Sequence, residues 1–424
     1  MIQKFENVPD INGVLNLPGD KSISHRAVMF GALADGVSVI KNCSQAEDVV
    51  STMSCFEKMG VKFERGEEIK IYGKGFKGLT PPEGALYAGN SGTTARLISG
   101  VLCAQGFEST LTGDESLSSR PMSRVVEPLK LMGACFETSE KVTLPLRIIP
   151  SGKLKAVNYK LQVASAQVKS AMLLAGLFIE DETVIIEHVA TRNHTEKMLG
   201  LKTEQEDDGK KIFVSKNDYP KPFVMTIPSD ISSAAFFIIL ALLTKGSEIL
   251  IKHVTLNETR TGFLQLVKDM GGRIIIEDEQ EENGERRGDI RVFSSRLMNI
   301  EIPEYIIPNI IDEIPILSVA GVFASGKFVV RNAKELRVKE SDRIKSMCLN
   351  FKMMGLNVTE FEDGFEIDGN ISGTNFTFES FGDHRIAMAF AVMSMLLPNG
   401  GTINGFEAVA ISNPSFLKQL NKII

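Results

Sequence analysis

Six copies of one pattern run along this sequence, and they restrict its fold more than any other feature. Each copy begins with a short polar turn, continues as a helix-like run of small apolar residues, and ends in a Gly or acidic turn followed by a β-type run. The copies begin at Gly19, Gly89, Val163, Pro228, Ile311 and Gly382. Repetition of this kind is typical of folds assembled from copies of one supersecondary unit.

A second, amphipathic helix is predicted after the first in each copy. Four of these helices end at a glycine, which suits a left-handed C-cap; the glycines are Gly60, Gly133, Gly271 and Gly355. With the β-type runs, each unit reads strand, helix, strand, helix, strand, strand. A chain of 424 residues exceeds the size of a single core. We therefore predict two similar α/β domains of three units each.

The sixth copy ends after its second helix and lacks the strands that should follow. Residues 1–13 can supply a missing strand, which makes one domain discontinuous. We expect this domain to comprise residues 1–16 and 229–424, with repeats 4 to 6, and an inserted domain to comprise residues 17–228, with repeats 1 to 3. Pro and turn residues at both boundaries also suit ordinary loops.

Charge and composition limit the possible partners. The chain has 47 basic and 53 acidic residues and a net charge of −6, so no global basic field attracts nucleic acid or an anionic membrane. The first residues lack the features of a signal or transit peptide, and the longest apolar run, Ala234–Leu243, is about half a membrane span. Five cysteines without a CxxC pair predict reduced thiols. We expect a cytoplasmic protein without nucleic-acid or membrane partners.

The turns that open the copies are rich in Gly, Ser, Asp and Asn, so they leave helix N–H groups available. Such N-termini attract anions. A single turn of this kind is usually only a good N-cap. Basic residues in or just after the turns favour an anion-binding site between the domains; they are Lys21, Arg26, Arg96, Lys169 and Arg385.

Seven segments hold most of the polar residues: PGDKSISHR (Pro18–Arg26), GNSGTTAR (Gly89–Arg96), SSRPM (Ser118–Met122), ASAQVKSA (Ala164–Ala171), IDEIP (Ile311–Pro315), RVKESDRIK (Arg337–Lys345) and GDHR (Gly382–Arg385). In this order and along the whole chain, they resemble the signature segments of 5-enolpyruvylshikimate-3-phosphate synthases. The resemblance implies two inverse α/β-barrel domains, each of three βαβαββ repeats, with the active site in the interdomain cleft. It also implies transfer of the enolpyruvyl group of phosphoenolpyruvate to the 5-hydroxyl of shikimate 3-phosphate, through a tetrahedral intermediate, in chorismate and aromatic amino acid biosynthesis.

The resemblance also implies the site residues. Those for shikimate 3-phosphate are Lys21, Ser22, Arg26, Ser165, Ala166, Gln167, Arg192, Asp312 and Lys339. Those for phosphoenolpyruvate are Lys21, Asn90, Gly92, Arg120, Gln167, Arg343 and Arg385. Guanidinium groups suit this role because they bind phosphate and carboxylate bidentately.

The implied catalytic residues are two carboxylates and a lysine. We expect Asp312 to act on the hydroxyl and Glu340 on the methylene carbon, with Lys21 assisting. Without the resemblance, IDE and KESDR would be interpreted as a helix cap and a solvated charge run. The resemblance implies no cofactor and no metal, only two small-molecule substrates, and a monomer is expected.

Two positions depart from the family pattern or bear on inhibition. Many relatives carry a lysine or another polar residue in the segment that here reads AISNPSF, with Ile411 and Asn413, so one anion contact is expected to be absent or supplied elsewhere. Gly92 stands where some members have alanine, a change associated with tolerance of glyphosate. Glycine leaves room beside a bound anion and predicts sensitivity, although Ser91 differs from the common alanine.

Two other functions remain as alternatives. The enolpyruvyl transferase that acts on UDP-N-acetylglucosamine shares the repeats, but it would carry a lysine–asparagine pair near the N-terminus and a cysteine in the loop that here reads SLSSRPM. A non-catalytic anion-binding or scaffolding protein could retain the repeats. The presence of Lys21, Asp312 and Glu340 together disfavours that alternative.

Three further signals are given structural interpretations. GKGFKG (Gly73–Gly78) precedes LTPPEG rather than a helix, so we predict a turn and not a dinucleotide site. The acidic stretch Glu277–Asp289 is interpreted as a solvated hairpin tip. His188, His194 and His253 are expected to be structural or surface residues.

Overall fold

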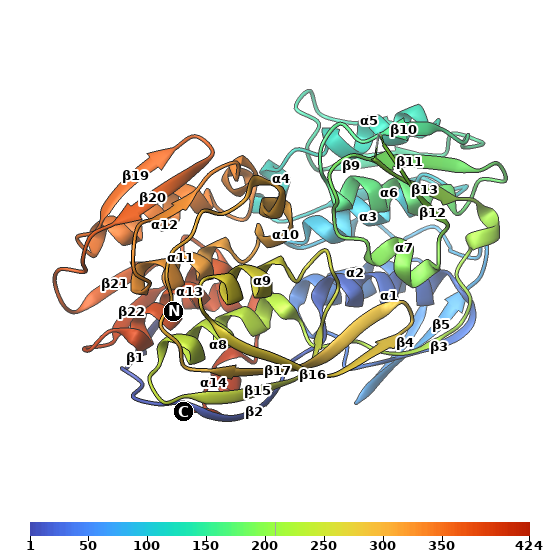
Figure 1. Ribbon diagram of the computed structural model, residues 1–424. Coiled ribbons are helices and arrows are strands. Elements are labelled where there is room, and N and C mark those ends of the chain that lie inside the picture. Colours follow the sequence, from blue (N-terminus) through green and yellow to red (C-terminus); the bar gives the residue numbers. More distant parts are fainter. Residues whose placement is uncertain (208) are drawn as a thin grey trace. The chain divides into compact units, whose positions relative to one another are not determined.

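The computed structural model describes residues 1–207 and 209–424, and Figure 1 shows its elements. The chain divides into two compact units. Unit 1 comprises Met1–Pro18, Pro228–Gln280 and Arg286–Ile424, and unit 2 comprises Gly19–Ile227 and Glu281–Glu285. Five residues of a hairpin tip therefore belong to unit 2, whereas the strands on either side of the tip lie largely in unit 1.

Unit 2 contains three four-stranded sheets of one design. Their strand orders are β14 (Val224–Thr226), β3 (Asp35–Lys41), β5 (Glu68–Lys74), β4 (Lys62–Arg65); β6 (Leu86–Tyr87), β7 (Ser109–Thr112), β9 (Leu146–Ile149), β8 (Cys135–Glu137); and β10 (Asn158–Lys160), β11 (Thr183–Glu187), β13 (Gly209–Val214), β12 (Thr203–Glu206). In each sheet the first pair is parallel and the other two pairs are antiparallel. The repeated order shows three copies of one unit.

Unit 1 also contains three sheets. Their orders are β16 (Arg273–Glu282), β17 (Glu285–Phe293), β15 (Glu248–Thr255), β2 (Asn12–Asn16); β18 (Phe328–Val330), β20 (Gly364–Asp368), β19 (Asn357–Phe361); and β1 (Ile2–Phe5), β22 (Gly401–Asn404), β21 (Phe376–Glu379). Strand β1 is antiparallel to β22, with Ile2 opposite Asn404. The first strand of the chain thus completes the sheet of the sixth copy.

The segments that lead from one unit to the other exchange strands. Strand β2 is parallel to β15 of unit 1, although the helix that follows β2 in the chain belongs to unit 2. Strand β14 is parallel to β3 of unit 2, although the next helix belongs to unit 1. Each unit therefore contains an opening strand for each of its four-stranded sheets.

The helix that opens each copy lies in the interior of its unit. These helices are α1 (Lys21–Leu33), α3 (Gly92–Leu102) and α6 (Ala166–Gly176) in unit 2, and α8 (Ile231–Leu243), α11 (Ile314–Phe323) and α13 (His384–Leu396) in unit 1. They are buried on nearly all sides, as expected for helices without a polar face. The small apolar runs predicted them correctly.

The second helices end as predicted. They include α2 (Glu47–Lys58), α5 (Ser123–Leu131), α9 (Gly262–Asp269) and α12 (Arg343–Met353). The glycine two residues after each has a positive φ between 77° and 99°, which residues with a Cβ rarely adopt. The shorter helices are α4 (Glu115–Ser119), α7 (His194–Leu199), α10 (Ile307–Ile310) and α14 (Phe416–Leu420), with 3₁₀ turns η1 (Lys216–Asp218), η2 (Glu304–Ile306), η3 (Lys334–Val338) and η4 (Phe406–Ile411).

Five of the six opening helices carry a side-chain N-cap. Asp20, Ser91, Ser165, Asp230 and Asp383 each accept a hydrogen bond from a backbone N–H of the first turn. These caps use some of the donors that the sequence left available for anions.

Among the described residues, no single helix is long and apolar enough to cross a membrane; Glu304–Ile310 and Ile314–Phe323 reach the required length and hydropathy only as a pair bent by 115°.

The acidic hairpin is not solvated throughout, which corrects the prediction. Strands β16 and β17 form the hairpin (Figure 1), but the side chain of Glu285 is 1% exposed. Its Oε1 atom lies 2.7 Å from Nδ1 of the buried His194. The charge pattern did not reveal this contact because its partner lies far away in the sequence.

Candidate active site

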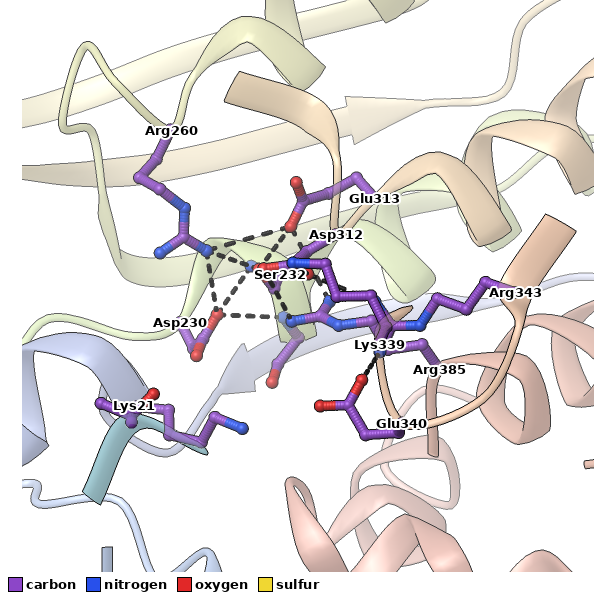
Figure 2. A network of polar contacts seen from close by, with 12 residues as sticks. Lys21, Asp230, Ser232, Arg260, Asp312, Glu313, Lys339, Glu340, Arg343 and Arg385 are labelled. Atoms are coloured by element: carbon purple, nitrogen blue, oxygen red, sulfur yellow. Dashed lines mark hydrogen bonds and ion pairs between the residues drawn. The ribbon is translucent and has the colours of Figure 1, made fainter. Parts of the chain in front are cut away.

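Arg343 holds three carboxylates in unit 1 (Figure 2). It is the first residue of α12, and its side chain is 1% exposed. Its guanidinium donates to Glu340 Oε2 at 2.6 Å, to Asp383 Oδ2 at 2.8 Å and to Asp312 Oδ1 at 3.3 Å. The predicted catalytic carboxylates Asp312 and Glu340 thus share one cation.

The charges of this group support one another. Burial by itself lowers the pKa of Arg343, but Asp383, Glu340 and Asp312 raise it above its usual value. Burial by itself raises the pKa of Asp383, but the charge of Arg343 holds it below its usual value. Arg343 is therefore a permanent cation, and Asp383 is an anion that fixes it. The interpretation of KESDR as a solvated charge run is wrong for Arg343.

Asp312 also lies beside two other predicted site residues (Figure 2). Lys339 Nζ is 3.7 Å from Asp312 Oδ1, and Arg385 Nη2 is 3.9 Å from Asp312 Oδ2. Asp383 caps α13 by accepting from the backbone N–H of Arg385 at 2.8 Å. The structure thus brings together all five predicted site residues of unit 1.

A second buried carboxylate, which the sequence did not reveal as functional, lies next to Asp312. Glu313 is fully buried and accepts a hydrogen bond from Ser232 Oγ. Its Oε1 atom is 3.8 Å from Arg385 Nη1 and 3.9 Å from Arg260 Nη2 (Figure 2). Arg385 therefore lies between two carboxylates, which limits the directions its guanidinium can take. The adjacent acidic residues of IDEIP were the only sequence signal for this arrangement.

In unit 2, Lys21 opens α1 directly after its N-cap Asp20. Lys21 Nζ donates to Asp48 Oδ2 at 2.8 Å, and both side chains are partly exposed, by 20% and 10%. Asp48 was not predicted, because it belongs to α2 and lies outside the seven segments. The ion pair holds the lysine in place while leaving part of it accessible.

Arg26 is anchored at every nitrogen of its guanidinium. It donates through Nε to Thr195 Oγ1 at 2.7 Å, through Nη2 to Ser170 Oγ at 2.8 Å and through Nη1 to the carbonyl oxygen of Ser22 at 2.9 Å. Burial lowers its pKa to about 10. Arg192 lies near enough for its charge to contribute to this lowering. Three residues predicted for shikimate 3-phosphate, Ser22, Arg26 and Arg192, are therefore neighbours.

Two of the predicted phosphoenolpyruvate residues of unit 2, Asn90 and Gln167, each accept a hydrogen bond from an arginine. Arg120 Nη2 donates to Asn90 Oδ1 at 2.8 Å. Arg96 Nη1 donates to Gln167 Oε1 at 2.7 Å. Gly92 lies between the pairs, because a Cβ built on it would be 2.9 Å from Arg96 Nη1 and 3.7 Å from Arg120 Nη1.

The segment before Gln167 opens α6. Ser165 caps this helix by accepting from Val168 N, and Ala166 is its first residue. Further along the helix, Lys169 is fully buried and pairs with Glu187 and Glu196, each at 2.7 Å. Lys169 is thus used inside the unit, which corrects its assignment to an anion-binding surface.

His25 is enclosed between the two substrate-motif cations Lys21 and Arg26. It is fully buried, and its Nδ1 atom is 2.7 Å from Thr52 Oγ1. Burial and the charges of Lys21 and Arg26 lower the pKa of His25 well below 6.5. The imidazole is therefore neutral at neutral pH.

The segment AISNPSF, which departs from the family pattern, contains no charged residue. Ile411 ends η4, and Asn413 is buried, with Nδ2 donating to Gln419 Oε1 at 2.8 Å. The amide of Asn413 is thus engaged within unit 1. Among the described residues, no group of three or more His, Cys, Asp and Glu side chains could hold a metal ion.

Comparisons with known proteins show the family of the chain. The family model of EPSP synthase (3-phosphoshikimate 1-carboxyvinyltransferase) matches residues 5–420. A 3-phosphoshikimate 1-carboxyvinyltransferase of Thermoanaerobacter sp. (strain X514) is 45% identical over 417 residues, which cover 97% of this chain and 98% of the relative. The structure of an EPSP synthase from Acinetobacter baumannii is 43% identical, with a TM-score of 0.87 over 99% of this chain and 97% of that chain.

A more distant structure defines the class of fold. The enolpyruvyl transferase NikO from Streptomyces tendae has a TM-score of 0.77 and 13% identity, covering 100% of this chain and 97% of that chain. The fold is therefore the two-domain inverse α/β fold of enolpyruvyl transferases. Within that class, the match over nearly the whole chain and the close relatives show that the chain belongs to the EPSP synthase family.

Proposed function

We propose that this protein transfers the enolpyruvyl group of phosphoenolpyruvate to the 5-hydroxyl of shikimate 3-phosphate and releases phosphate. The observation that carries the proposal is Arg343, which binds both Asp312 and Glu340 within two motifs of the family. A buried cation with two partly exposed carboxylates is suited to a reaction that needs both a base and an acid.

The reaction proceeds by addition and elimination. Asp312 accepts the proton of the 5-hydroxyl while the hydroxyl oxygen forms a bond to C2 of phosphoenolpyruvate. Glu340 donates a proton to C3, so that the methylene becomes a methyl group. In the elimination, the C2–O bond to phosphate breaks, C3 returns a proton to Glu340 as the double bond reforms, and phosphate leaves with the proton that Asp312 had accepted. Lys21 assists, and its charge stabilises the departing phosphate.

The other predicted residues bind the two substrates. We assign the binding of phosphoenolpyruvate to Lys21, Asn90, Gly92, Arg120, Gln167, Arg343 and Arg385. We assign the binding of shikimate 3-phosphate to Lys21, Ser22, Arg26, Ser165, Ala166, Gln167, Arg192, Asp312 and Lys339. The anchored guanidinium of Arg26 supports this assignment, because an arginine with fixed orientation loses little entropy when it binds a carboxylate.

The experiment measures phosphate release from phosphoenolpyruvate with and without shikimate 3-phosphate. Wild-type protein should release phosphate only when both substrates are present. Asp312→Asn should lower the rate by roughly 10²–10⁴-fold, as expected for the loss of a general base. Asp269→Asn removes the same charge at an exposed position of α9 and should leave the rate unchanged.

Two outcomes would contradict the proposal. One is a folded wild-type protein that releases no phosphate, which would favour the non-catalytic alternative. The other is release that does not depend on shikimate 3-phosphate.

The proposal also includes a cytoplasmic monomer that uses no cofactor. Light scattering in solution tests whether the protein is a monomer, and full activity after dialysis against a chelator tests the absence of a metal.

A further inference from the structure

The tip of the β16–β17 hairpin is part of unit 2 and lies against helix α7. Residues Glu281–Glu285 belong to unit 2, although the residues on both sides belong to unit 1. Asn283 Nδ2 donates to the carbonyl oxygen of Val224 at 3.3 Å. A Cβ built on Gly284 would lie 2.6 Å from the carbonyl oxygen of Lys197 in α7. The backbone of the tip is thus in close contact with the helix.

Within this contact, Glu285 forms a buried polar pair with the first residue of α7. Its Oε1 atom is 2.7 Å from His194 Nδ1, and the two side chains are 1% and 0% exposed. A carboxylate only accepts hydrogen bonds, so Nδ1 of His194 donates. Buried pairs of this kind are costly to disrupt, because removal of one partner leaves the other without compensation.

Residues of helix α7 bind two buried cations, of which Arg26 belongs to the proposed site. Thr195, next to His194, accepts from Arg26 Nε at 2.7 Å. Glu196 pairs with Lys169 at 2.7 Å. Arg192 immediately precedes the helix N-cap, Asn193. A displacement of the first turn of α7 would therefore move the partner of Arg26 and the position of Arg192 together.

We propose that Glu285 is a positioning residue for the shikimate 3-phosphate site. Through His194, its carboxylate holds the first turn of α7 in the place where Thr195 orients Arg26 and where Arg192 faces the same ligand. This inference rests on the proposed function, because it assigns Arg26 and Arg192 to shikimate 3-phosphate. The negative charge of Glu285 also acts on Arg26, whose pKa it raises. Glu285 itself does not touch the substrate.

The test compares Glu285→Gln with Glu281→Gln by steady-state phosphate release, in which each substrate is varied in turn. Glu281 is an exposed residue of the same tip, so its replacement matches the charge change. Glu285→Gln keeps an acceptor for His194 Nδ1 but removes the charge that strengthens the hydrogen bond, so KM for shikimate 3-phosphate should rise roughly fivefold. KM for phosphoenolpyruvate should change less than about twofold. Glu281→Gln should match wild type for both substrates.

Two variants of His194 separate positioning from a general loss of stability. In His194→Asn the amide nitrogen can occupy the place of Nδ1 and donate to Glu285, whereas His194→Leu removes the donor. The asparagine variant should retain the wild-type KM for shikimate 3-phosphate, and the leucine variant, which has no donor, should raise it at least as much as Glu285→Gln does. Calorimetric titration with shikimate 3-phosphate alone provides a readout without turnover, and its Kd should follow the same order.

The outcomes distinguish the two proposals. An inactive, folded wild type would overturn the proposed function. An active wild type with an unchanged KM for shikimate 3-phosphate in folded Glu285→Gln would overturn the positioning role alone. Equal increases in KM for both substrates, or equal defects in the two His194 variants, would also overturn it, because they indicate a structural effect without specificity.

Discussion

Replacing Gly92 with alanine is expected to weaken the binding of phosphoenolpyruvate more than that of shikimate 3-phosphate. The new Cβ would lie 2.9 Å from Arg96 Nη1, closer than carbon and nitrogen atoms approach in packed proteins. Because Nη1 is the end of a long side chain, Arg96 can move by about half an ångström and the fold can tolerate the change. The cost therefore falls on the contacts of Arg96 and not on the helix.

The loss of the hydrogen bond between Arg96 and Gln167 sets the size of the expected rise in KM. Arg96 Nη1 is the atom that donates to Gln167 Oε1 at 2.7 Å. A hydrogen bond to a charged group contributes about 1.5–3 kcal/mol, which corresponds to roughly a tenfold to hundredfold rise in KM for phosphoenolpyruvate. Gln167 is also proposed to contact shikimate 3-phosphate, so a smaller rise in that KM is expected.

The assay is phosphate release at saturating shikimate 3-phosphate with phosphoenolpyruvate varied. Gly106→Ala is the matched control, because a Cβ at that position meets no atom within 4 Å, and it should behave as wild type. An unchanged KM for phosphoenolpyruvate in Gly92→Ala would refute the reasoning. So would a Gly92→Ala protein that fails to fold, since the steric conflict was assigned to a flexible side chain.

The remaining predictions concern buried ionisable side chains of unit 2. Because the pKa of His25 is lowered in the folded protein, the unfolded chain takes up the proton first, and stability should fall by up to ~1.4 kcal/mol per pH unit as the pH decreases below about 6.5. Urea unfolding at pH 7.5 and 5.5 should show a weaker pH dependence in His25→Asn; equal dependence in both proteins would contradict this. Lys169→Met leaves Glu187 and Glu196 buried without their cation and should cost about 3–5 kcal/mol. In the same unfolding assay Lys216→Met, at a side chain that is 39% exposed, should cost less than about 1 kcal/mol, and similar costs for the two lysine variants would exclude a special role for burial.

The sequence was sufficient for the elements whose signal is local. The apolar runs predicted the six opening helices, and glycines such as Gly60 and Gly355 predicted where the second helices end. Burial is reflected in the spacing of apolar residues and the end of a helix in a nearby glycine, so these elements can be found without a structure. The turn at GKGFKG was also predicted correctly, because a glycine-rich segment without a following helix cannot form a dinucleotide site.

The interactions that were missed join residues far apart in the chain. Asp48, Arg260 and Glu285 lie outside the signature segments, and each pairs with a residue of another element. Charge patterning reports how polar a segment is but not which distant side chain it meets. For the same reason, Lys169 was assigned to an anion-binding surface although two buried glutamates use its charge.

The antiparallel pairing of β1 with β22 has a consequence for the synthesis of the protein on the ribosome. Ile2 is synthesised about 400 residues before its partner Asn404. At translation rates of about 5–20 residues per second, roughly 20–80 s separate the two. During that interval β1 is an unpaired strand that could join another chain, whereas most of unit 2 can already assemble. A ribosome stalled after about residue 350, with Glu281–Glu285 outside the exit tunnel, should thus carry a protease-resistant unit 2 and a cleavable strand β1.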